Sequence, residues 1–214
     1  WDAWLKHAFL VEKRTPEELL AEFPRAPPVE GRLRGRGAEA RRLLELLAGG
    51  APLRINCGGQ TFRDESGQSW SRDIFFCGGQ VWYLKGPEEP GSRELRDDPM
   101  LRSILWQPHP ARRLPIYAIP LPPGGYRVTL HFNDTRRSPE WKAGVFDIVI
   151  EDETRRERFE PSAAAGNSLP DPATFDVQVD DGELNLEFLR RSSHRPSIAG
   201  LEIEHLPEGV QKRR

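Results

Sequence analysis

The stretch YRVTLHF, residues 126–132, alternates apolar and polar side chains along its whole length. Its apolar members are Tyr126, Val128, Leu130 and Phe132, and its polar members are Arg127, Thr129 and His131. Because consecutive side chains of a β-strand point to opposite faces, this pattern predicts a strand with one face in a core and the other in water. The same period of two recurs in residues 146–150, 175–179, 184–188 and 199–203.

Turn sequences, and not helices, separate these one-sided strands. Residues 122–125 (PPGG) predict a turn that leads into the strand at Tyr126. Residues 180–182 (DDG) predict a hairpin turn in which Gly182 takes a positive φ. Short one-sided strands in this order favour two sheets packed face to face. We therefore expect a mainly β fold, an antiparallel two-sheet β-sandwich of jelly-roll-like type, over residues 51–206.

The first fifty residues follow a helical period instead. An apolar face with helical spacing is formed by Trp1, Trp4, Leu5, Ala8 and Phe9. Residues 15–18 (TPEE) form a capping box with proline at the first helical position, and residues 38–47 predict another helix that stops at Gly49 and Gly50. We expect a helical segment with a Pro-rich linker at 1–50, the sandwich at 51–206 and a polar tail at 207–214. The apolar face must be covered by the sandwich, another domain or a second chain.

Composition excludes several classes of function. The 31 Lys and Arg residues are balanced by 33 Asp and Glu residues, with a formal net charge of -2. Nucleic acid is therefore not an expected partner, because its binding depends on an excess of positive charge. No apolar run approaches the length of about 20 residues that a membrane-spanning helix needs, so we expect no membrane insertion.

The ends and the cysteines leave alternatives open. The chain opens on Trp1 and its only methionine is Met100, so we expect the native start, with any signal peptide, to precede it. A helical stub before a Pro-rich connector is typical of a module from a multidomain protein. Cys57 and Cys77 each precede two glycines. They form one bridge or none, because two cysteines are not a disulfide framework.

Short motifs in a fixed order give the chain a family resemblance. The first is RINCGG at 54–59, and later ones are SILW at 103–106, IYAIPL at 116–121, GYRVTLHF at 125–132, VFDI at 145–148, FDV at 175–177, GEL at 182–184 and PSIAGLEI at 196–203. Over residues 51–206 the chain resembles malectin and malectin-like domains, including those of plant receptor kinases. The resemblance implies a non-catalytic carbohydrate-binding β-sandwich in an extracellular, periplasmic or lumenal location.

The resemblance also implies a ligand site. Malectin binds a short glucose oligosaccharide through loop aromatics and one carboxylate. The first aromatic position falls near Trp82 and Tyr83, and the second falls near Pro110, with Trp106 and His109 close by. An adjacent aromatic pair falls near Arg136 and Arg137, beyond Asp134, and the carboxylate falls near His194, beside Arg195. Three of these four features are changed here.

The changed positions make this predicted site more cationic. The arginines that we expect near it are Arg112, Arg113, Arg136, Arg137, Arg190, Arg191 and Arg195. If they converge, they favour an acidic oligosaccharide, a phosphate or an acidic protein surface. Paired arginines are also common on solvated loops, which is the plainer interpretation. Similarly, Trp70, Trp82, Trp106 and Trp141 are either sugar platforms or core residues.

Enzyme chemistry finds little support in the sequence. Glycoside hydrolysis needs two carboxylates that flank the bond, and the candidates Asp73 and Asp134 are more typical of loop carboxylates that accept hydrogen bonds from amides. Metal-binding, phosphate-binding and nucleophile motifs are absent from the sequence. We therefore expect no enzyme, no cofactor and no metal. Two hypotheses remain, glycan recognition and a protein-interaction module on a scaffold that has lost sugar binding.

Overall fold

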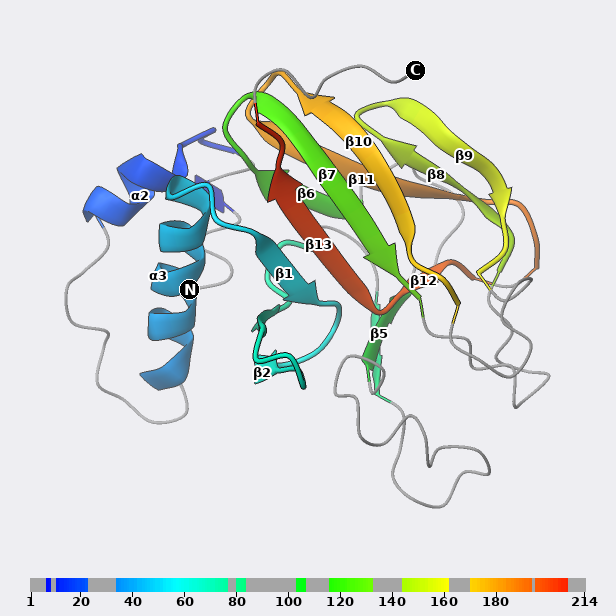
Figure 1. The fold of residues 1–214 in the computed structure, drawn as a ribbon, viewed down its shortest axis with the longest axis horizontal. Coiled ribbons are helices and arrows are strands. Elements are labelled where there is room, and N and C mark those ends of the chain that lie inside the picture. Colours follow the sequence, from blue (N-terminus) through cyan, green and yellow to red (C-terminus); the bar gives the residue numbers. More distant parts are fainter. Residues whose placement is uncertain are drawn as a thin grey trace.

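The computed structural model describes residues 7–8, 11–22, 34–76, 80–83, 103–106, 116–132, 144–161, 170–193 and 195–207, and only the main chain at 34–37, 80–83 and 103–106. Within these residues, helices α2 (Pro16–Glu22) and α3 (Arg34–Ala48) precede the strands (Figure 1). The strands are β1 (Leu53–Asn56), β2 (Phe62–Arg63), β3 (Ser69–Arg72), β4 (Gln80–Tyr83), β5 (Ser103–Trp106), β6 (Tyr117–Pro120), β7 (Gly124–His131), β8 (Phe146–Ile150), β9 (Glu153–Phe159), β10 (Ala173–Val179), β11 (Glu183–Arg190), β12 (Ser197–Ile198) and β13 (Gly200–His205).

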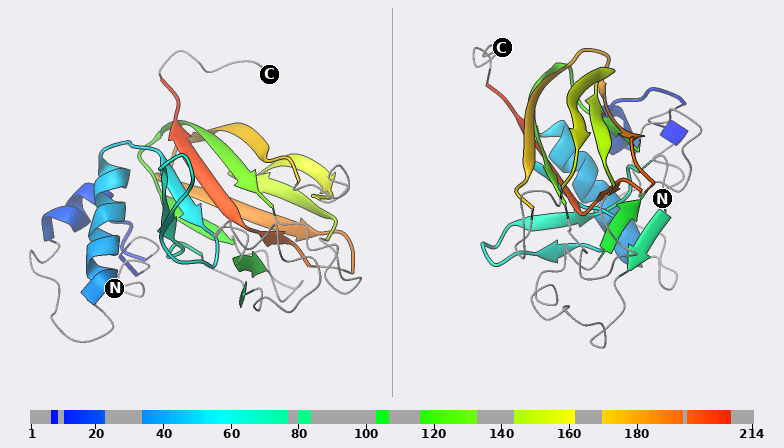
Figure 2. Two further views of the ribbon diagram at one scale, coloured as in Figure 1. Left: turned by 60° about the horizontal axis from the view of Figure 1, so that its bottom comes forward. Right: turned by 90° about the vertical axis from the view of Figure 1, so that its right-hand side faces the viewer.

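Two sheets pack against each other, as Figures 1 and 2 show. The larger sheet has the order β10-β7-β13-β1-β3-β2, and the smaller sheet has the order β6-β11-β8-β9. A third sheet has the order β12-β5-β4. All pairs are antiparallel except β1 with β3. The predicted fold class, a mainly β two-sheet sandwich with a short N-terminal helical segment, is confirmed.

The alternation in β7 separates core from surface as predicted. Tyr126, Val128 and Leu130 are buried, whereas Arg127 is exposed and His131 is half-buried. Neighbouring strands add polar side chains to the outer face of this sheet. Glu202 of β13 accepts a hydrogen bond from Arg54 Nε of β1 (2.8 Å) and pairs with His131 Nε2 of β7 (2.7 Å). This network joins three strands on the outer face of the larger sheet.

The turn at 180–182 is not a hairpin turn. Gly182 has the predicted positive φ, +88°, but β10 belongs to the larger sheet and β11 to the smaller one. The turn therefore carries the chain from one layer to the other. The connection from β6 to β7 crosses between the same two layers. Local turn chemistry does not determine which strand becomes the partner, and this is why the hairpin prediction was wrong.

The predicted helix caps are confirmed. The Thr15 hydroxyl accepts a hydrogen bond from the Glu18 amide (3.2 Å), and the Glu18 carboxylate accepts one from the Thr15 amide (3.0 Å). Helix α3 starts at Arg34, four residues before the predicted start, and ends in a Schellman motif. In this motif Gly50 has a φ of +63°, and the Ala51 amide donates to the Leu46 carbonyl.

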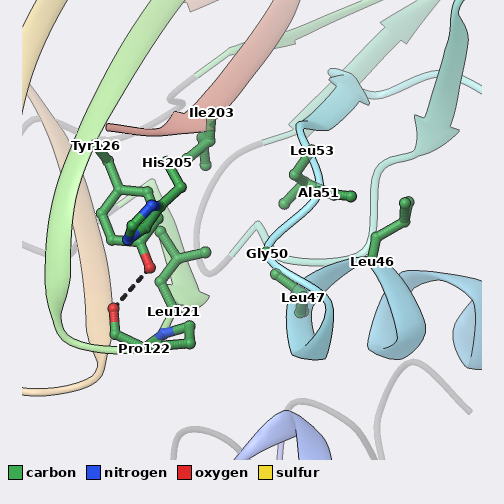
Figure 3. Close-up of a pocket in the computed structure, with 10 residues that line it drawn as sticks. All are labelled: Leu46, Leu47, Gly50, Ala51, Leu53, Leu121, Pro122, Tyr126, Ile203 and His205. Carbon is green, nitrogen blue, oxygen red and sulfur yellow. Dashed lines mark hydrogen bonds between the residues drawn. The ribbon is translucent and has the colours of Figure 1, made fainter. Parts of the chain in front are cut away.

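The helical segment packs against the sandwich. Leu46 and Leu47 of α3 line a small apolar pocket with Leu53 of β1, Tyr126 of β7 and Ile203 of β13 (Figure 3). Buried residues of the segment belong to the same hydrophobic cluster as the sandwich core; they are Ala8, Leu19, Ala40, Leu43, Leu44 and Leu47. The remainder of the predicted first apolar face, Trp1, Trp4, Leu5 and Phe9, lies outside the described residues. The domain boundaries at 50 and 206 stay a prediction.

Candidate functional site

Four phenylalanines close one end of the sandwich. Phe132 follows β7, Phe146 begins β8, Phe159 ends β9 and Phe188 lies near the end of β11. Their ring centroids lie 4.7 to 6.4 Å apart in contacting pairs, and all four are buried. We call this end, where β7 and β11 finish, the loop end. The packed aromatic rings form the core beneath the segments that leave this end.

The third sheet lies at the loop end and brings together predicted site residues from distant parts of the chain. Strand β5 pairs with both β4 and β12. Trp82 is opposite Ile104, and Trp106 is opposite both Gln80 and Ser197. Directly opposite residues share a face, so Trp82 and Trp106 occupy register positions on one face of this sheet. Tyr83 falls on the other face, which it shares with the fully buried Ile198.

The other predicted site residues are less well defined. His109, Asp134, Arg136, Arg137 and His194 lie outside the described residues. Arg195 is exposed and precedes β12 by two residues, so it lies close to the third sheet along the chain. The structure thus brings Trp82, Tyr83, Trp106 and Arg195 to one region.

Two of the arginines expected near the site bind partners within the protein. Arg190 donates to the main-chain oxygens of Ser192 (2.6 Å from Nε) and Ser193. Arg191 Nε donates to Asp147 of β8 (2.8 Å), and this hydrogen bond lowers the pKa of the buried Asp147 carboxyl. Both side chains thus fix the segment between β11 and β12. These pairings of Arg190 and Arg191 do not support the predicted cationic cluster.

The RINCGG motif has a structural role. Asp73 Oδ2 accepts hydrogen bonds from the Gly58 amide and the Tyr117 hydroxyl, both at 2.7 Å. Cys57 is buried, and burial, followed by the charge of Asp73, raises the pKa of its thiol well above the ordinary value. Cys77 lies outside the described residues. A buried Asp73 with these partners is a structural carboxylate, not one that flanks a substrate bond.

Trp70 is buried and does not form a sugar platform. It is 4% exposed, stacks on Phe62 with a centroid distance of 5.9 Å, and meets His131 edge-on. Its Nε1 donates to Asp64, whose pKa is lowered to about 2 by hydrogen bonds from the Ser66 hydroxyl and from Trp70 itself. Among the described residues, no three His, Cys, Asp or Glu side chains are grouped to hold a metal ion. In the same part of the chain, no helix is long and apolar enough to span a membrane.

A two-sheet sandwich whose aromatic positions lie together at the loop end is typical of β-sandwich binding modules. Within this class, the chain belongs to the malectin domain family, whose match covers residues 52–203. Members of this family are non-catalytic modules for carbohydrate binding or protein interaction. Among curated protein sequences, none matches the chain.

Solved structures with the same fold come from bacteria and plants. Bacteroides uniformis β-glucuronidase has 21% identity and a TM-score of 0.57, over 74% of this chain and 18% of that chain. The ANXUR2 extracellular domain of Arabidopsis thaliana has 18% identity and a TM-score of 0.56, over 71% and 47%. The complex of the plant peptide RALF23 with FER and LLG2 has 21% identity and a TM-score of 0.55, over 73% and 40%.

These neighbours share the fold at low identity. The chain spans 18% to 47% of their lengths. In the glucuronidase, the shared part is a small fraction of the enzyme, and it is therefore no evidence of hydrolase activity in this chain.

Proposed function

We propose that this protein is a non-catalytic glycan-binding module whose site lies at the loop end, on the sheet formed by β4, β5 and β12. The observation that carries the proposal is the register of Trp82 and Trp106. They occupy diagonal positions on the face opposite to that of the buried Ile198. Diagonal neighbours on adjacent strands are about 7–8 Å apart, which places two aromatic positions within reach of one ligand.

The chemistry of sugars fits this arrangement. A sugar ring presents a face of C–H groups, which packs on aromatic rings, and a rim of hydroxyls, which pair with polar side chains. Arg195, close to β12, supplies a cation for a carboxylate-bearing sugar. The ligand classes to test are therefore neutral glucose oligosaccharides and acidic oligosaccharides with uronic acid units.

A glycan array with both ligand classes tests this function. We expect saturable binding to at least one oligosaccharide. We expect Trp82→Ala/Trp106→Ala to weaken it by about ten-fold or more, because buried aromatic contacts carry much of the affinity of small sites. The variant Trp82→Phe/Trp106→Phe, which keeps aromatic faces, should retain most of the binding. Near-UV circular dichroism of each variant checks that the sandwich is folded.

The matched control is Asp180→Asn/Asp181→Asn, a double change at the opposite end of the sandwich, which should leave glycan binding unaffected. The absence of binding to every oligosaccharide, or equal binding by the wild-type protein and the double tryptophan variant, would exclude glycan binding at the loop end.

A protein-interaction module is the second candidate function. Three of the four carried-over features of the family's sugar site are changed here, and a structural neighbour is complexed with a peptide. In addition, a pocket at the opposite end of the sandwich is lined by four acidic and two basic residues, and this excess of acidic side chains suits a basic peptide. Binding to a peptide with silence on all glycans would favour this second function.

A further inference from the structure

A pocket of about 380 Å³ lies where the N-terminal segment meets the sandwich. Its lining comes from three stretches, residues 13–17, 120–123 and 180–183. The last two stretches are the connections from β6 to β7 and from β10 to β11. The pocket therefore lies at the end where β7 and β11 begin, opposite to the loop end. Its volume falls within the range of ligand-binding clefts.

The walls of the pocket combine proline rings with acidic side chains. Prolines occupy position 16 and positions 120, 122 and 123. Proline rings present apolar surface on a main chain that is already restricted. Little conformational entropy is therefore lost when a ligand binds against them. The lining also contains four acidic residues, Glu17, Asp180, Asp181 and Glu183, and two basic residues, Lys13 and Arg14.

Both cations are already paired. Lys13 Nζ lies 3.1 Å from Glu183 Oε2, and Arg14 Nη2 lies 2.6 Å from Glu22 Oε1, outside the pocket. Asp180 accepts a hydrogen bond from the Gln178 amide group, and Asp181 accepts one from the Glu183 main chain. In the part of the chain that the structure describes, no ion pair joins Glu17, Asp180 or Asp181 to a cation. The pocket therefore keeps an excess of negative charge.

The neighbouring Glu151 responds to this charge. The pKa of Glu151 is raised to about 7, mainly by burial, and the charges of Asp181, Asp152 and Glu183 contribute to this rise. Lys13 shows how a basic side chain fits here. Its largely exposed side chain places the ammonium on Glu183, beside the prolines of the β6–β7 connection.

We propose that this pocket binds a basic peptide segment of a protein partner. A Lys or Arg side chain enters it, the methylene groups lie on the prolines of 120–123, and the charged group meets Asp180 and Asp181. Long basic side chains combine an apolar stem with a charged end, which matches these walls. Charge-assisted hydrogen bonds to carboxylates supply the specificity. This site is independent of the glycan site proposed at the loop end.

Fluorescence anisotropy with the fluorescein-labelled peptide Gly-Lys-Gly-Arg-Gly tests the proposal on the full chain. We expect saturable binding at about 50 mM NaCl that weakens at about 300 mM, because salt screens exposed charges. The variant Asp180→Asn/Asp181→Asn should bind about ten-fold more weakly. Each asparagine keeps an oxygen for the hydrogen bond that the aspartate accepts, so the turn is preserved. The acidic peptide Gly-Glu-Gly-Glu-Gly should not bind.

The matched control is Glu160→Gln/Asp171→Asn, which removes the same charge from two exposed positions at the loop end. It should leave the affinity for the basic peptide unchanged. A further variant should raise the affinity for the basic peptide. Lys13→Gln releases Glu183 for the ligand and should tighten binding by about three-fold.

Three results would overturn the proposal. The first is the absence of saturable binding of the basic peptide at the lower salt concentration. The second is an equal loss of affinity in the control variant and in the pocket double variant. The third is a lower affinity of the Lys13→Gln variant than of the wild-type protein. The last result remains informative if the aspartate variant folds poorly, because Lys13 is exposed. A failure of glycan binding at the loop end would not alter any of these outcomes.

Discussion

At the scale of single residues, the motif that carries the family resemblance is a set of close contacts. Asp73 holds the Gly58 amide and the Tyr117 hydroxyl, and it thereby links the β1–β2 connection to β6. The next residue, Gly59, lies against Asn56, whose side-chain amide donates to the Gln60 carbonyl at 2.7 Å. The hydrogen bonds of Asp73 are buried, so the loss of either one leaves a partner unsatisfied.

The first prediction concerns Gly59. A Cβ atom at this position would lie 2.1 Å from Asn56 Nδ2, a separation that no relaxed structure tolerates. Gly59→Ala should therefore lower the free energy of unfolding by about 2–3 kcal/mol, as overpacking does. Gly67→Ala is the control, because its φ is +82° but nothing lies within 4 Å. It should cost only about 1 kcal/mol of backbone strain. Urea denaturation measures both, and equal costs would contradict the packing argument.

The second prediction concerns Glu151. Its pKa is raised by burial from 4.5 to about 7, so between these values the folded state binds more protons than the unfolded state. Its contribution to stability is therefore present below about pH 4.5 and is lost as the pH rises to about 7. Glu151→Gln keeps an oxygen for the Asn185 amide but does not titrate.

The measurement for Glu151 is the free energy of unfolding at pH 5 and pH 8. The stabilising effect of Glu151→Gln relative to the wild-type protein should be larger at pH 8. Asp152→Asn, at the exposed neighbouring position, serves as the control. A difference between Glu151→Gln and the wild-type protein that is the same at both pH values would refute the assignment.

At the scale of elements, periodicity predicts the strands and a capping motif predicts the helix start, but neither predicts which strands pair with each other. The alternation in β7 and the capping box of α2 depend on neighbours along the chain, and both are confirmed. The β10–β11 connection was misread because a DDG turn has the same local chemistry whether it joins strands within a sheet or between sheets. The sequence does not indicate the β8–β9 turn, because Glu151 and Asp152 are not the residue types that are typical of a turn with this geometry.

The third prediction follows from this turn. Glu151 and Asp152 have φ values of +53° and +57°, and Ile150 pairs with Glu153 across a two-residue loop. Such loops favour glycine at the second position, so Asp152→Gly should raise the free energy of unfolding by about 0.5–1 kcal/mol. Glu153→Gly, one residue later in β9, should lower it by a similar amount because glycine weakens a strand. Thermal melts that rank the two variants in the opposite order would contradict the turn assignment.

At the scale of the whole molecule, the helical segment and the sandwich share one core. Leu44 and Leu47 of α3 and Leu19 of α2 are buried in the same cluster as the strands. The sequence predicts an apolar face on this segment but not what covers it, because the cover consists of residues distant along the chain. The same limit applies to the candidate site. Resemblance points to Trp82 or Tyr83 and, at the second position, to Pro110 with Trp106 close by in sequence. That Trp82 and Trp106 share a face depends on the pairing of β4 with β5.

The fourth prediction tests the shared core. Leu44 is fully buried, and Leu44→Ala should lower the free energy of unfolding by about 2–5 kcal/mol, the usual cost of a cavity in a core. Far-UV circular dichroism reports the helices and near-UV circular dichroism reports the aromatic core. Both should show one coincident transition in this variant and in the wild-type protein. Separate transitions would show that the helices and the sandwich fold independently.

Glycan recognition at the loop end is tested most directly by backbone NMR shifts during titration with glucose and uronic acid oligosaccharides. The largest changes are expected at the amides of Trp82, Trp106 and Ser197, with the amides of Asp180 and Asp181 unchanged. Shifts confined to the pocket between the helices and the sandwich, or no shifts with any oligosaccharide, would contradict a sugar site at the loop end.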